Sequence, residues 1–355
     1  MVLVKERPLL LPIIQGGMGI GVSLGNLAGH VAKHGAMGVI SAANPGFAAP
    51  DFWKNAMRCN IAALKEQIQK AKQIAQGNGW VSINAMVATT HYEETIQAAV
   101  EAGADAVISG AGLPSDLPAY VKGSQTAIAP IVSSGRAAHT ICRLWDKRHQ
   151  VCPDFIVIEG PMAGGHLGFH AEELENGNAQ TPEQILPEVL AEIKPYEEKY
   201  QRRIPVFVAG GVYTAEDIAR FLKLGAAGVQ IGTRFIATEE CDASERYKEI
   251  LVAAKKEDIC LIKSPVGMPG RALNSPLIQR LRKELRIPVQ KCADCLHPCD
   301  PATTPYCITK ALSEAVRGNW EEGLFFCGSN AWRLDRILPV QKLLEELKQG
   351  WRDSQ

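Results

Sequence analysis

The chain has 355 residues, in which 38 lysine and arginine residues balance 38 aspartate and glutamate residues. Because there is no excess of positive charge to attract nucleic acid or an anionic membrane surface, we expect neither as a partner. The length exceeds that of an ordinary single core but suits one β/α barrel, which takes about 250 residues, with an extension.

The N-terminal segment and the cysteines indicate the compartment. The first apolar run is interrupted at Gln15 by a glycine cluster, so it is too short to span a membrane, and it lacks a small-residue cleavage site. We therefore expect a cytoplasmic protein. Five of the ten cysteines stand singly in apolar segments and are predicted to be buried thiols rather than disulfide partners: Cys59, Cys142, Cys152, Cys241 and Cys260.

Short apolar runs, turns and amphipathic helical stretches alternate along the first 262 residues. The eight predicted strands are Leu11–Gln15, Met37–Ala42, Trp80–Asn84, Ala104–Ser109, Ala127–Val132, Asp154–Glu159, Pro205–Ala209 and Ala227–Ile231. The predicted helices are Leu24–His34, Ile61–Ile74, Glu93–Ala102, Arg136–Lys147, Pro182–Tyr200, Ala215–Leu224 and Ser244–Lys256. This alternation predicts parallel strands with crossover helices, and eight such units favour an α/β fold of the (β/α)8 TIM barrel type. A doubly wound open sheet is the alternative.

A stretch rich in proline and glycine, Lys263–Pro276, is predicted to mark the end of the barrel. We therefore divide the chain into a barrel, residues 1–262, and a C-terminal extension, residues 263–355, which packs on the barrel. The extension contains a cysteine-bearing loop, Lys291–Cys307, followed by two predicted helices, Ile308–Arg317 and Val340–Lys348.

The residues that follow each predicted strand indicate the site, because functional groups of β/α barrels lie at the C-terminal ends of the strands. Glycines follow the last two strands, at Gly210, Gly211 and Gly232, the last next to Thr233. Such loops form a backbone-amide cradle for a phosphate group, although they also serve as simple tight turns. A G-x-G-x-x-G motif with a following acidic residue is absent after the first strand, which disfavours a Rossmann nicotinamide site.

Five motifs resemble, in this order, those of the nitronate monooxygenase (2-nitropropane dioxygenase) family. They are Leu11–Met18, Asn84, Ala163–His166, Ala209–Val212 and Gly228–Phe235, and Gly270–Asn274 is similar to the family's segment just after the barrel. The resemblance covers about residues 8 to 280 and implies a flavin-dependent oxidoreductase with FMN as cofactor. It implies an FMN phosphate on Gly210, Gly211, Gly232 and Thr233 and an FMN ring near Gly16, Met18, Asn84 and Gln230. Gly165 is a further expected cofactor-binding residue. Relatives of the family include FMN-dependent enoyl-acyl-carrier-protein reductases and NADH:quinone reductases.

His166 is the candidate catalytic residue. An imidazole titrates near working pH, and the two preceding glycines let the backbone bring it over a cofactor. Its role as a base is what the resemblance implies. The family often has glutamate where this chain has Met162, which leaves the choice of substrate open.

Three functions are therefore considered. The first is oxidation of an alkyl nitronate with O2, and the second is reduction of an enoyl-acyl-carrier-protein substrate or a quinone with NAD(P)H. The third is a cofactor-binding sensor without turnover. The expected partners are a small-molecule substrate, with NAD(P)H in the second case, and a homodimer is one of the open oligomeric states.

Four cysteines stand close together in the extension: Cys292, Cys295, Cys299 and Cys307. Four thiolates in one loop suit a [4Fe–4S] cluster or a tetrahedral zinc ion, although their spacing matches neither a standard ferredoxin motif nor a zinc ribbon. The prediction is a metal centre, most readily [4Fe–4S], with zinc and a metal-free loop as alternatives. Cys327 is an alternative ligand.

Overall fold

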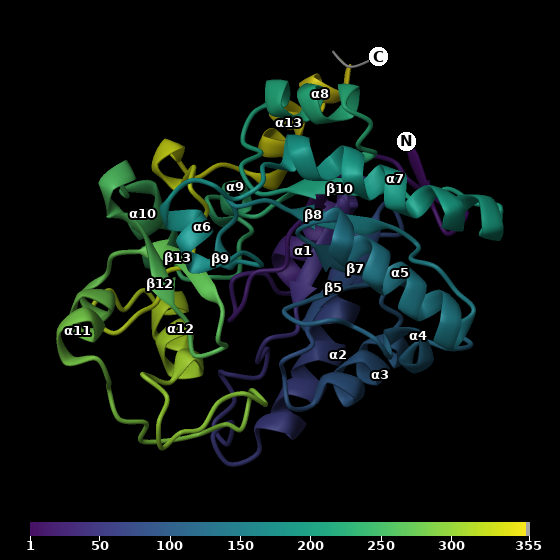
Figure 1. Cartoon of the computed structure of the whole chain (residues 1–355). Helices are drawn as coiled ribbons and strands as arrows, with labels where there is room; N and C mark the ends of the chain where they lie inside the picture. The colour runs from purple at the N-terminus through teal and green to yellow at the C-terminus, as the bar shows by residue number, and fades with distance from the viewer. Residues whose placement is uncertain (353–355) are drawn as a thin grey trace.

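The computed structural model describes residues 1–352 and has a closed, eight-stranded parallel barrel at its centre (Figure 1). The strands follow one another around the barrel in the order β10-β11-β3-β4-β5-β6-β7-β8. Their bounds are β3 (Ile13–Gln15), β4 (Met37–Ser41), β5 (Trp80–Met86), β6 (Ala106–Gly110), β7 (Ala127–Val132), β8 (Ile156–Glu159), β10 (Val206–Ala209) and β11 (Gly228–Ile231). The prediction of a (β/α)8 barrel is confirmed, and the open-sheet alternative is wrong.

Each of the eight predicted strands is present because each is a short run of apolar residues buried on both faces. One apolar cluster fills the inside of the barrel and includes Ile14, Val39 and Phe207. A second, larger cluster lies between the strands and the surrounding helices. Gln15 is a buried polar exception at the end of β3, and its side-chain amide bonds to both the N–H and the carbonyl oxygen of Val39. This amide therefore ties β3 to β4, where backbone pairing is short.

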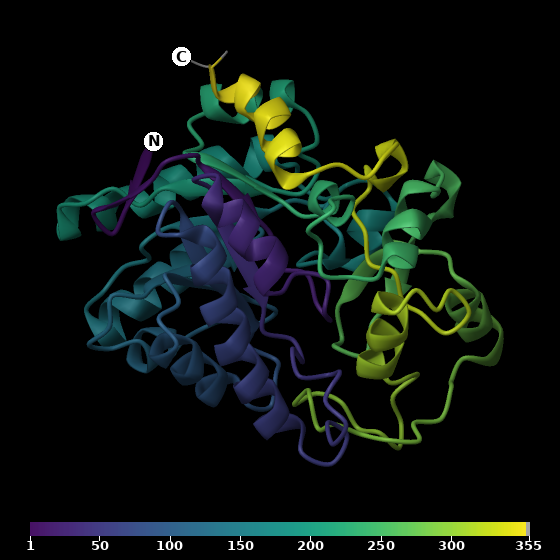
Figure 2. The ribbon, with the colours of Figure 1, turned by 180° about the vertical axis from the view of Figure 1, so that it is seen from behind.

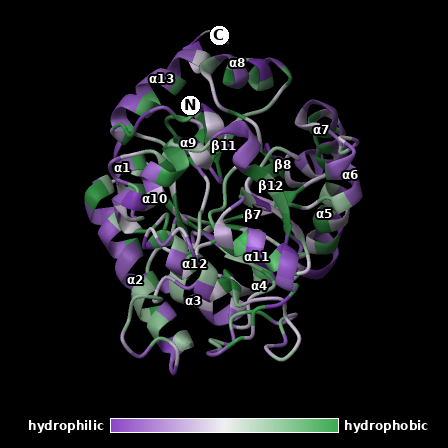
Figure 3. Cartoon of the chain, turned by 90° about the vertical axis from the view of Figure 1, so that its left-hand side faces the viewer, coloured by the Kyte–Doolittle hydropathy of each residue, from purple (hydrophilic) through white to green (hydrophobic). Residues whose placement is uncertain are grey.

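Helices surround the barrel, and Figure 2 shows α1 and α2 lying along the strands on one side. The helices between the barrel strands are α1 (Gly25–Lys33), α2 (Ala56–Ala75), α3 (Tyr92–Glu101), α4 (Leu117–Tyr120), α5 (Gly135–His149), α6 (Ala171–Glu175), α7 (Pro182–Tyr200) and α8 (Ala215–Lys223). After the last barrel strand come α9 (Thr233–Ile236), α10 (Glu245–Val252), α11 (Pro276–Glu284), α12 (Ile308–Val316) and α13 (Val340–Arg352). The long helices carry apolar and polar faces, as the alternating colours on α2 and α13 in Figure 3 show.

An N-terminal hairpin that was not predicted closes the N-terminal end of the barrel. Its strands are β1 (Val2–Val4) and β2 (Arg7–Leu9), which pair antiparallel. Val4 and Leu9 are fully buried and belong to the apolar cluster inside the barrel. The indole N–H of Trp80 donates to the Pro8 carbonyl oxygen at 3.0 Å. The site must therefore lie at the other end of the barrel.

The segment predicted to end the barrel is instead part of a small antiparallel sheet. This sheet contains β12 (Ile259–Lys263), β13 (Pro269–Leu273) and β9 (Gly165–His166), in the order β12-β13-β9. The Lys263–Pro276 stretch contains β13, which pairs with both of the other strands. The proposed boundary after residue 262 falls inside β12, and the last three residues of the extension, 353–355, lie outside the described part of the chain.

The cysteines agree with the prediction except at one position. Cys59, Cys142, Cys152 and Cys241 are buried, whereas Cys260 is only partly buried because it lies on β12. All ten cysteines are free thiols. Within residues 1–352, no helix combines the length and the apolar composition that a membrane span requires.

Candidate active site

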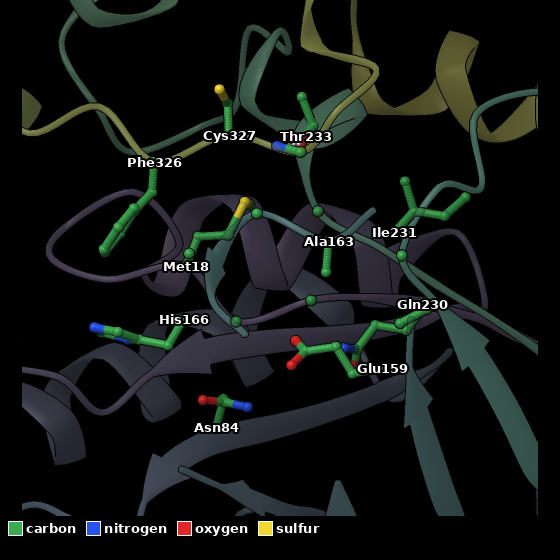
Figure 4. A pocket seen from close by; sticks show the side chains of 18 of the residues that line it. Met18, Asn84, Glu159, Ala163, His166, Gln230, Ile231, Thr233, Phe326 and Cys327 are labelled. Atoms are coloured by element: carbon green, nitrogen blue, oxygen red, sulfur yellow. Dashed lines mark hydrogen bonds between the residues drawn. The ribbon is translucent and has the colours of Figure 1, made fainter. Parts of the chain in front are cut away.

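A cavity of about 250 Å³ opens at the C-terminal ends of the barrel strands. The structure brings all ten predicted catalytic and cofactor-binding residues to its walls: Gly16, Met18, Asn84, Gly165, His166, Gly210, Gly211, Gln230, Gly232 and Thr233. Figure 4 shows the side chains of Gln230, Glu159, Asn84 and His166 following one another across this cavity. We call it the main cavity.

Two glycines shape its walls where a side chain would not fit. A Cβ atom on Gly17 would lie 2.4 Å from Cβ of Asn84, so only glycine lets the loop after β3 approach that residue. Gly211, after β10, has φ +97°, and a Cβ atom there would lie 3.1 Å from the Met162 sulfur. The glycine loops predicted from the sequence therefore serve close approach and special backbone geometry.

The loops after β10 and β11 present backbone N–H groups that lack a partner. The N–H groups of Gly211, Gly232 and Thr233 donate no hydrogen bond within residues 1–352. The neighbouring N–H of Thr214, in contrast, donates to the carboxylate of Asp217 at 3.0 Å. Free N–H groups from two adjacent loops form a site that an anion such as a phosphate can fill.

His166 lies on β9, where it pairs with Gly270 of β13. Its Nε2 atom lies 2.7 Å from Oγ of Ser264, and its ring packs edge-on against Phe326 with ring centroids 5.2 Å apart. Burial lowers the pKa of His166 to about 4, so the imidazole is neutral at ordinary pH. A neutral imidazole can donate a hydrogen bond from one nitrogen and accept one at the other.

Glu159 is a site residue that was not singled out from the sequence. It ends β8 and lines the main cavity, and within the described chain its carboxyl group has no hydrogen-bond or ion-pair partner. Burial raises its pKa to about 8, so the carboxyl group is protonated at neutral pH and can donate a hydrogen bond. The sequence does place a carboxyl residue at the end of a buried strand. What marks Glu159 as a site residue is that its carboxyl group has no hydrogen-bond or ion-pair partner among the described residues, and a sequence does not show this.

Two amide side chains beside Glu159 are also free to bind a ligand. The side chain of Asn84, which lies on β5, makes no hydrogen bond in residues 1–352, and Oε1 of Gln230, on β11, is buried without a partner. Buried polar groups normally have partners, so these groups indicate a polar ligand at the bottom of the main cavity. The ligand must offer both hydrogen-bond donors and acceptors.

The extension completes the upper wall of the main cavity, with Phe326, Cys327, Gly328 and Asn330 (Figure 4). The N–H of Gly328 donates to Oγ1 of Thr233 at 2.9 Å, and the Asn330 amide donates to the Gly211 carbonyl oxygen at 2.9 Å. These contacts join the extension to the loops after β10 and β11, which carry the free N–H groups. No motif marks these residues, because they lie far along the chain from the barrel loops that they contact.

Arg271 of β13 fixes the loop that carries His166. Its guanidinium group donates to the carbonyl oxygens of Pro161 and Ala163, each at 2.6 Å. The loop between β8 and β9 is therefore held by the small antiparallel sheet of the extension.

A smaller cavity of about 60 Å³ adjoins the main cavity beneath the cysteine-bearing loop. Ala43, Met86, His166 and Leu312 line both cavities. We call the smaller one the side chamber. Its walls are mainly apolar.

The predicted metal site has no support in the structure. Burial, with smaller contributions from the thiols of Cys307, Cys299 and Cys292, raises the pKa of Cys295 to about 11. In the described part of the chain, however, no three cysteine, histidine or acidic side chains are arranged to hold a metal ion. The metal centre therefore stays a prediction, which iron and zinc analysis of anaerobically purified protein would test.

The family follows from the match along the chain. A model of the family described as nitronate monooxygenase matches residues 3–350, which is nearly the whole sequence. The chain belongs to the nitronate monooxygenase family. It is accordingly an oxidoreductase.

Curated relatives are distant. A probable nitronate monooxygenase of Staphylococcus saprophyticus is 22% identical over 302 residues, covering 77% of this chain and 78% of the relative. A nitronate monooxygenase of Pseudomonas aeruginosa is 30% identical over 201 residues, covering 56% of this chain and 51% of the relative. An octahydroindene-carboxyl-CoA dehydrogenase of Rhodococcus jostii is 26% identical over 272 residues, covering 76% of this chain and 64% of the relative. The last two matches thus span less than two thirds of those relatives.

Solved structures share the fold over almost the whole chain. FabK from Thermotoga maritima is 25% identical with a TM-score of 0.72, and the match covers 97% of this chain and 93% of that one. A nitroalkane oxidase from Streptomyces ansochromogenes has the same TM-score of 0.72 at 19% identity, with 97% and 96% of the two chains covered.

Proposed function

We propose that the protein is an FMN-dependent enzyme that oxidises alkyl nitronates with O2. The observation that carries the proposal is the combination, in one cavity, of a neutral His166, an unpartnered polar floor and the free N–H groups of two adjacent loops. The family and its nitronate monooxygenase members support the choice of substrate.

The main cavity fits FMN at both ends. The N–H groups of Gly211, Gly232 and Thr233 would bind the phosphate, since they are free and come from adjacent strands. Gly210 shapes the same turn, because a Cβ atom there would lie 2.7 Å from the Gly160 carbonyl oxygen.

The floor of the cavity would hold the flavin ring. Asn84, Glu159 and Gln230 together offer hydrogen-bond donors and acceptors, which match the alternating carbonyl, N–H and ring nitrogen groups of a flavin. Gly16 and Met18 lie on the wall formed by the loop after β3, and Gly165 precedes His166. When bound, FMN would accept electrons from the nitronate and pass them to O2.

His166 would orient the substrate. A nitronate is an anion. Its negative charge would favour the protonated form of the imidazole and so raise the pKa of His166 again, which strengthens the interaction between the two groups. Ser264 restrains the imidazole through Nε2, so Nδ1 remains for the substrate. Phe326 packs edge-on against the ring and restricts its movement.

A second candidate is an NAD(P)H-dependent reductase of an enoyl thioester. The side chamber favours it, because a substrate with a long chain can pass His166 into that space. The likeness to the Rhodococcus jostii carboxyl-CoA dehydrogenase also supports a thioester substrate. A quinone reductase would use the same cavity.

Oxygen consumption with a nitronate and with its parent nitroalkane tests the proposal. We expect the FMN-loaded protein to consume O2 with the nitronate and without NAD(P)H. Turnover only when NAD(P)H and an enoyl thioester or quinone are both present would instead establish the second candidate. Absence of turnover with every one of these substrates, in protein that binds FMN, would indicate a non-catalytic flavoprotein.

A further inference from the structure

A cavity of about 210 Å³ lies apart from the main cavity, on another side of α12. It is enclosed by the segment between β4 and α2, by α11, by the segment that leads to the cysteines, and by α12. Leu312 of α12 lines the main cavity, whereas the next residue, Ser313, lines this one. Among residues 1–352, no residue lines both cavities. Figures 1 and 2 both show the cysteine-bearing segment beside the loop before α2. We call this space the α12 cavity.

Residues that line the α12 cavity carry buried polar atoms without partners. In residues 1–352, six buried side-chain atoms lack a hydrogen-bond partner, and three of them belong to residues that line this cavity: Nε of Arg280, the Tyr306 hydroxyl and Oγ of Ser313. Tyr306 and Ser313 are only 3% and 4% exposed. A fourth atom, Oε1 of Gln230, lies in the main cavity. Because an unpaired buried polar group lowers stability, three in one cavity indicate a ligand that pairs with them.

The charge of the lining favours an anion, because its two carboxylates, Glu314 and Glu322, are already paired with Arg317 and Arg280 and two lysines remain. Lys291 and Lys310 are exposed residues of the cavity wall, and neither side chain has an ion-pair or hydrogen-bond partner in the described structure. Arg280 is paired with Glu322 at 3.1 Å through Nη1, which leaves Nε free to donate elsewhere. Nε of Arg280 and the hydroxyl groups of Tyr306 and Ser313 are each able to donate a hydrogen bond to an anionic acceptor.

Apolar and aromatic residues also line the cavity. Phe47 and Trp53 come from the segment between β4 and α2, and Leu277, Ile287 and Val289 come from the extension. The indole of Trp53 is only partly buried and packs edge-on against Phe52. An aromatic wall of this kind suits a flat ring.

We propose that the α12 cavity binds a small organic anion, a carboxylate or phosphate carried on a flat ring. Tyr306, Ser313 and Arg280 bind the anionic group, Lys291 and Lys310 attract it, and Trp53 and Phe47 contact the ring. This site is separate from the flavin site and does not depend on the proposed reaction.

The experiment uses two probes that represent the two sources of the anion, adenosine monophosphate and benzoate, with the FMN-loaded full chain. Their uncharged counterparts, adenosine and benzyl alcohol, serve as ligand controls. We expect at least one anion to raise the Tm and to give a saturable calorimetric signal, and its uncharged counterpart to give neither. Adenosine monophosphate alone would identify a phosphate site, and benzoate alone a carboxylate site.

Tyr306→Phe tests whether the unpaired hydroxyl is the reason for binding. Loss of a hydrogen bond to a charged group should lower the affinity for the anion by about tenfold or more. The same change should leave the Tm of protein without probe equal or higher, because it removes an unpaired hydroxyl. Lys310→Met should also lower the affinity for the anion. Lys194→Met, at an exposed lysine of α7, should leave that affinity unchanged.

Binding of neither anion at millimolar concentration would show a cavity that holds only water and would overturn the proposal. Equal affinity of the wild type and Tyr306→Phe would overturn it as well. A lower Tm of Tyr306→Phe without probe would show that the hydroxyl has a partner within the protein, which contradicts the premise.

Discussion

Nε2 of His166 lies 2.7 Å from Oγ of Ser264, and this contact joins the candidate catalytic residue to the extension. Ser264 is 3% exposed and follows β12 directly, so its position is set by the sheet that also contains His166. The same hydroxyl accepts from the N–H of Val266 at 3.3 Å. The extension therefore holds the imidazole in place, and it also forms the upper wall of the main cavity.

Replacement of the imidazole tests its role. We expect His166→Ala to retain FMN and to lose activity by about 10²–10⁴-fold, as is typical when a group that acts in proton transfer or positioning is removed. Steady-state kcat/KM and the flavin content per chain are the measurements. Unchanged kcat/KM with the best substrate would remove His166 from the mechanism.

Ser264→Ala should reduce activity by about tenfold, because the imidazole loses the partner that fixes its orientation. The flavin content should not change. Ser275→Ala is a matched control, since Ser275 is equally buried and donates one hydrogen bond to the Gly323 carbonyl oxygen, away from the main cavity. We expect that control to lose about 1 kcal/mol of stability and no activity. Equal activity of the two variants would show that the contact with His166 is only structural.

Gly211→Asp should strip FMN from the protein, because it places a carboxylate where the phosphate is proposed to bind. Gly123→Asp controls for backbone strain: Gly123 has φ +82° and open space around it, and it precedes β7 at the opposite end of the barrel. The absorption spectrum after gel filtration gives the flavin content. Retention of FMN by the Gly211 variant would exclude this loop as the phosphate site.

Glu159 predicts a pH dependence of stability in cofactor-free protein. Its pKa is raised from 4.5 to about 8 on folding, so its contribution is fully present below pH 4.5 and is lost as the pH rises toward 8. The expected loss is at most about 1.4 kcal/mol per pH unit in that window. Glu159→Gln should remove this slope, and Glu66→Gln, at an exposed position of α2, should keep it. Parallel pH profiles of wild type and Glu159→Gln in chemical unfolding would contradict the assignment.

The barrel and most of its site were predictable because their signals are local. A run such as Met37–Ser41 is apolar throughout, which marks a strand buried on both faces, and Gly164 and Gly165 mark the turn before His166. The β1–β2 hairpin was missed because its strands have three residues each and a charged turn. Its stability comes from burial of Val4 and Leu9 in the barrel, which is a tertiary effect.

Long-range contacts account for the rest of what was missed. β13 pairs with the neighbouring β12 and also with His166 and Gly165, which lie about a hundred residues earlier in the chain. Phe326 and Asn330 join the main cavity from still further along. Glu159 and Tyr306 matter because their buried polar groups lack hydrogen-bond partners within residues 1–352. This lack can be recognised only when the residues around each side chain are known.

The most direct test of the proposed function is anaerobic mixing of the FMN-loaded protein with an alkyl nitronate in the absence of NAD(P)H. We expect the visible absorption of the flavin to decrease after the nitronate is mixed with the protein and to return when O2 is admitted. A flavin spectrum that the nitronate leaves unchanged, but that NADH or NADPH bleaches, would contradict nitronate oxidation and assign the protein to the reductases.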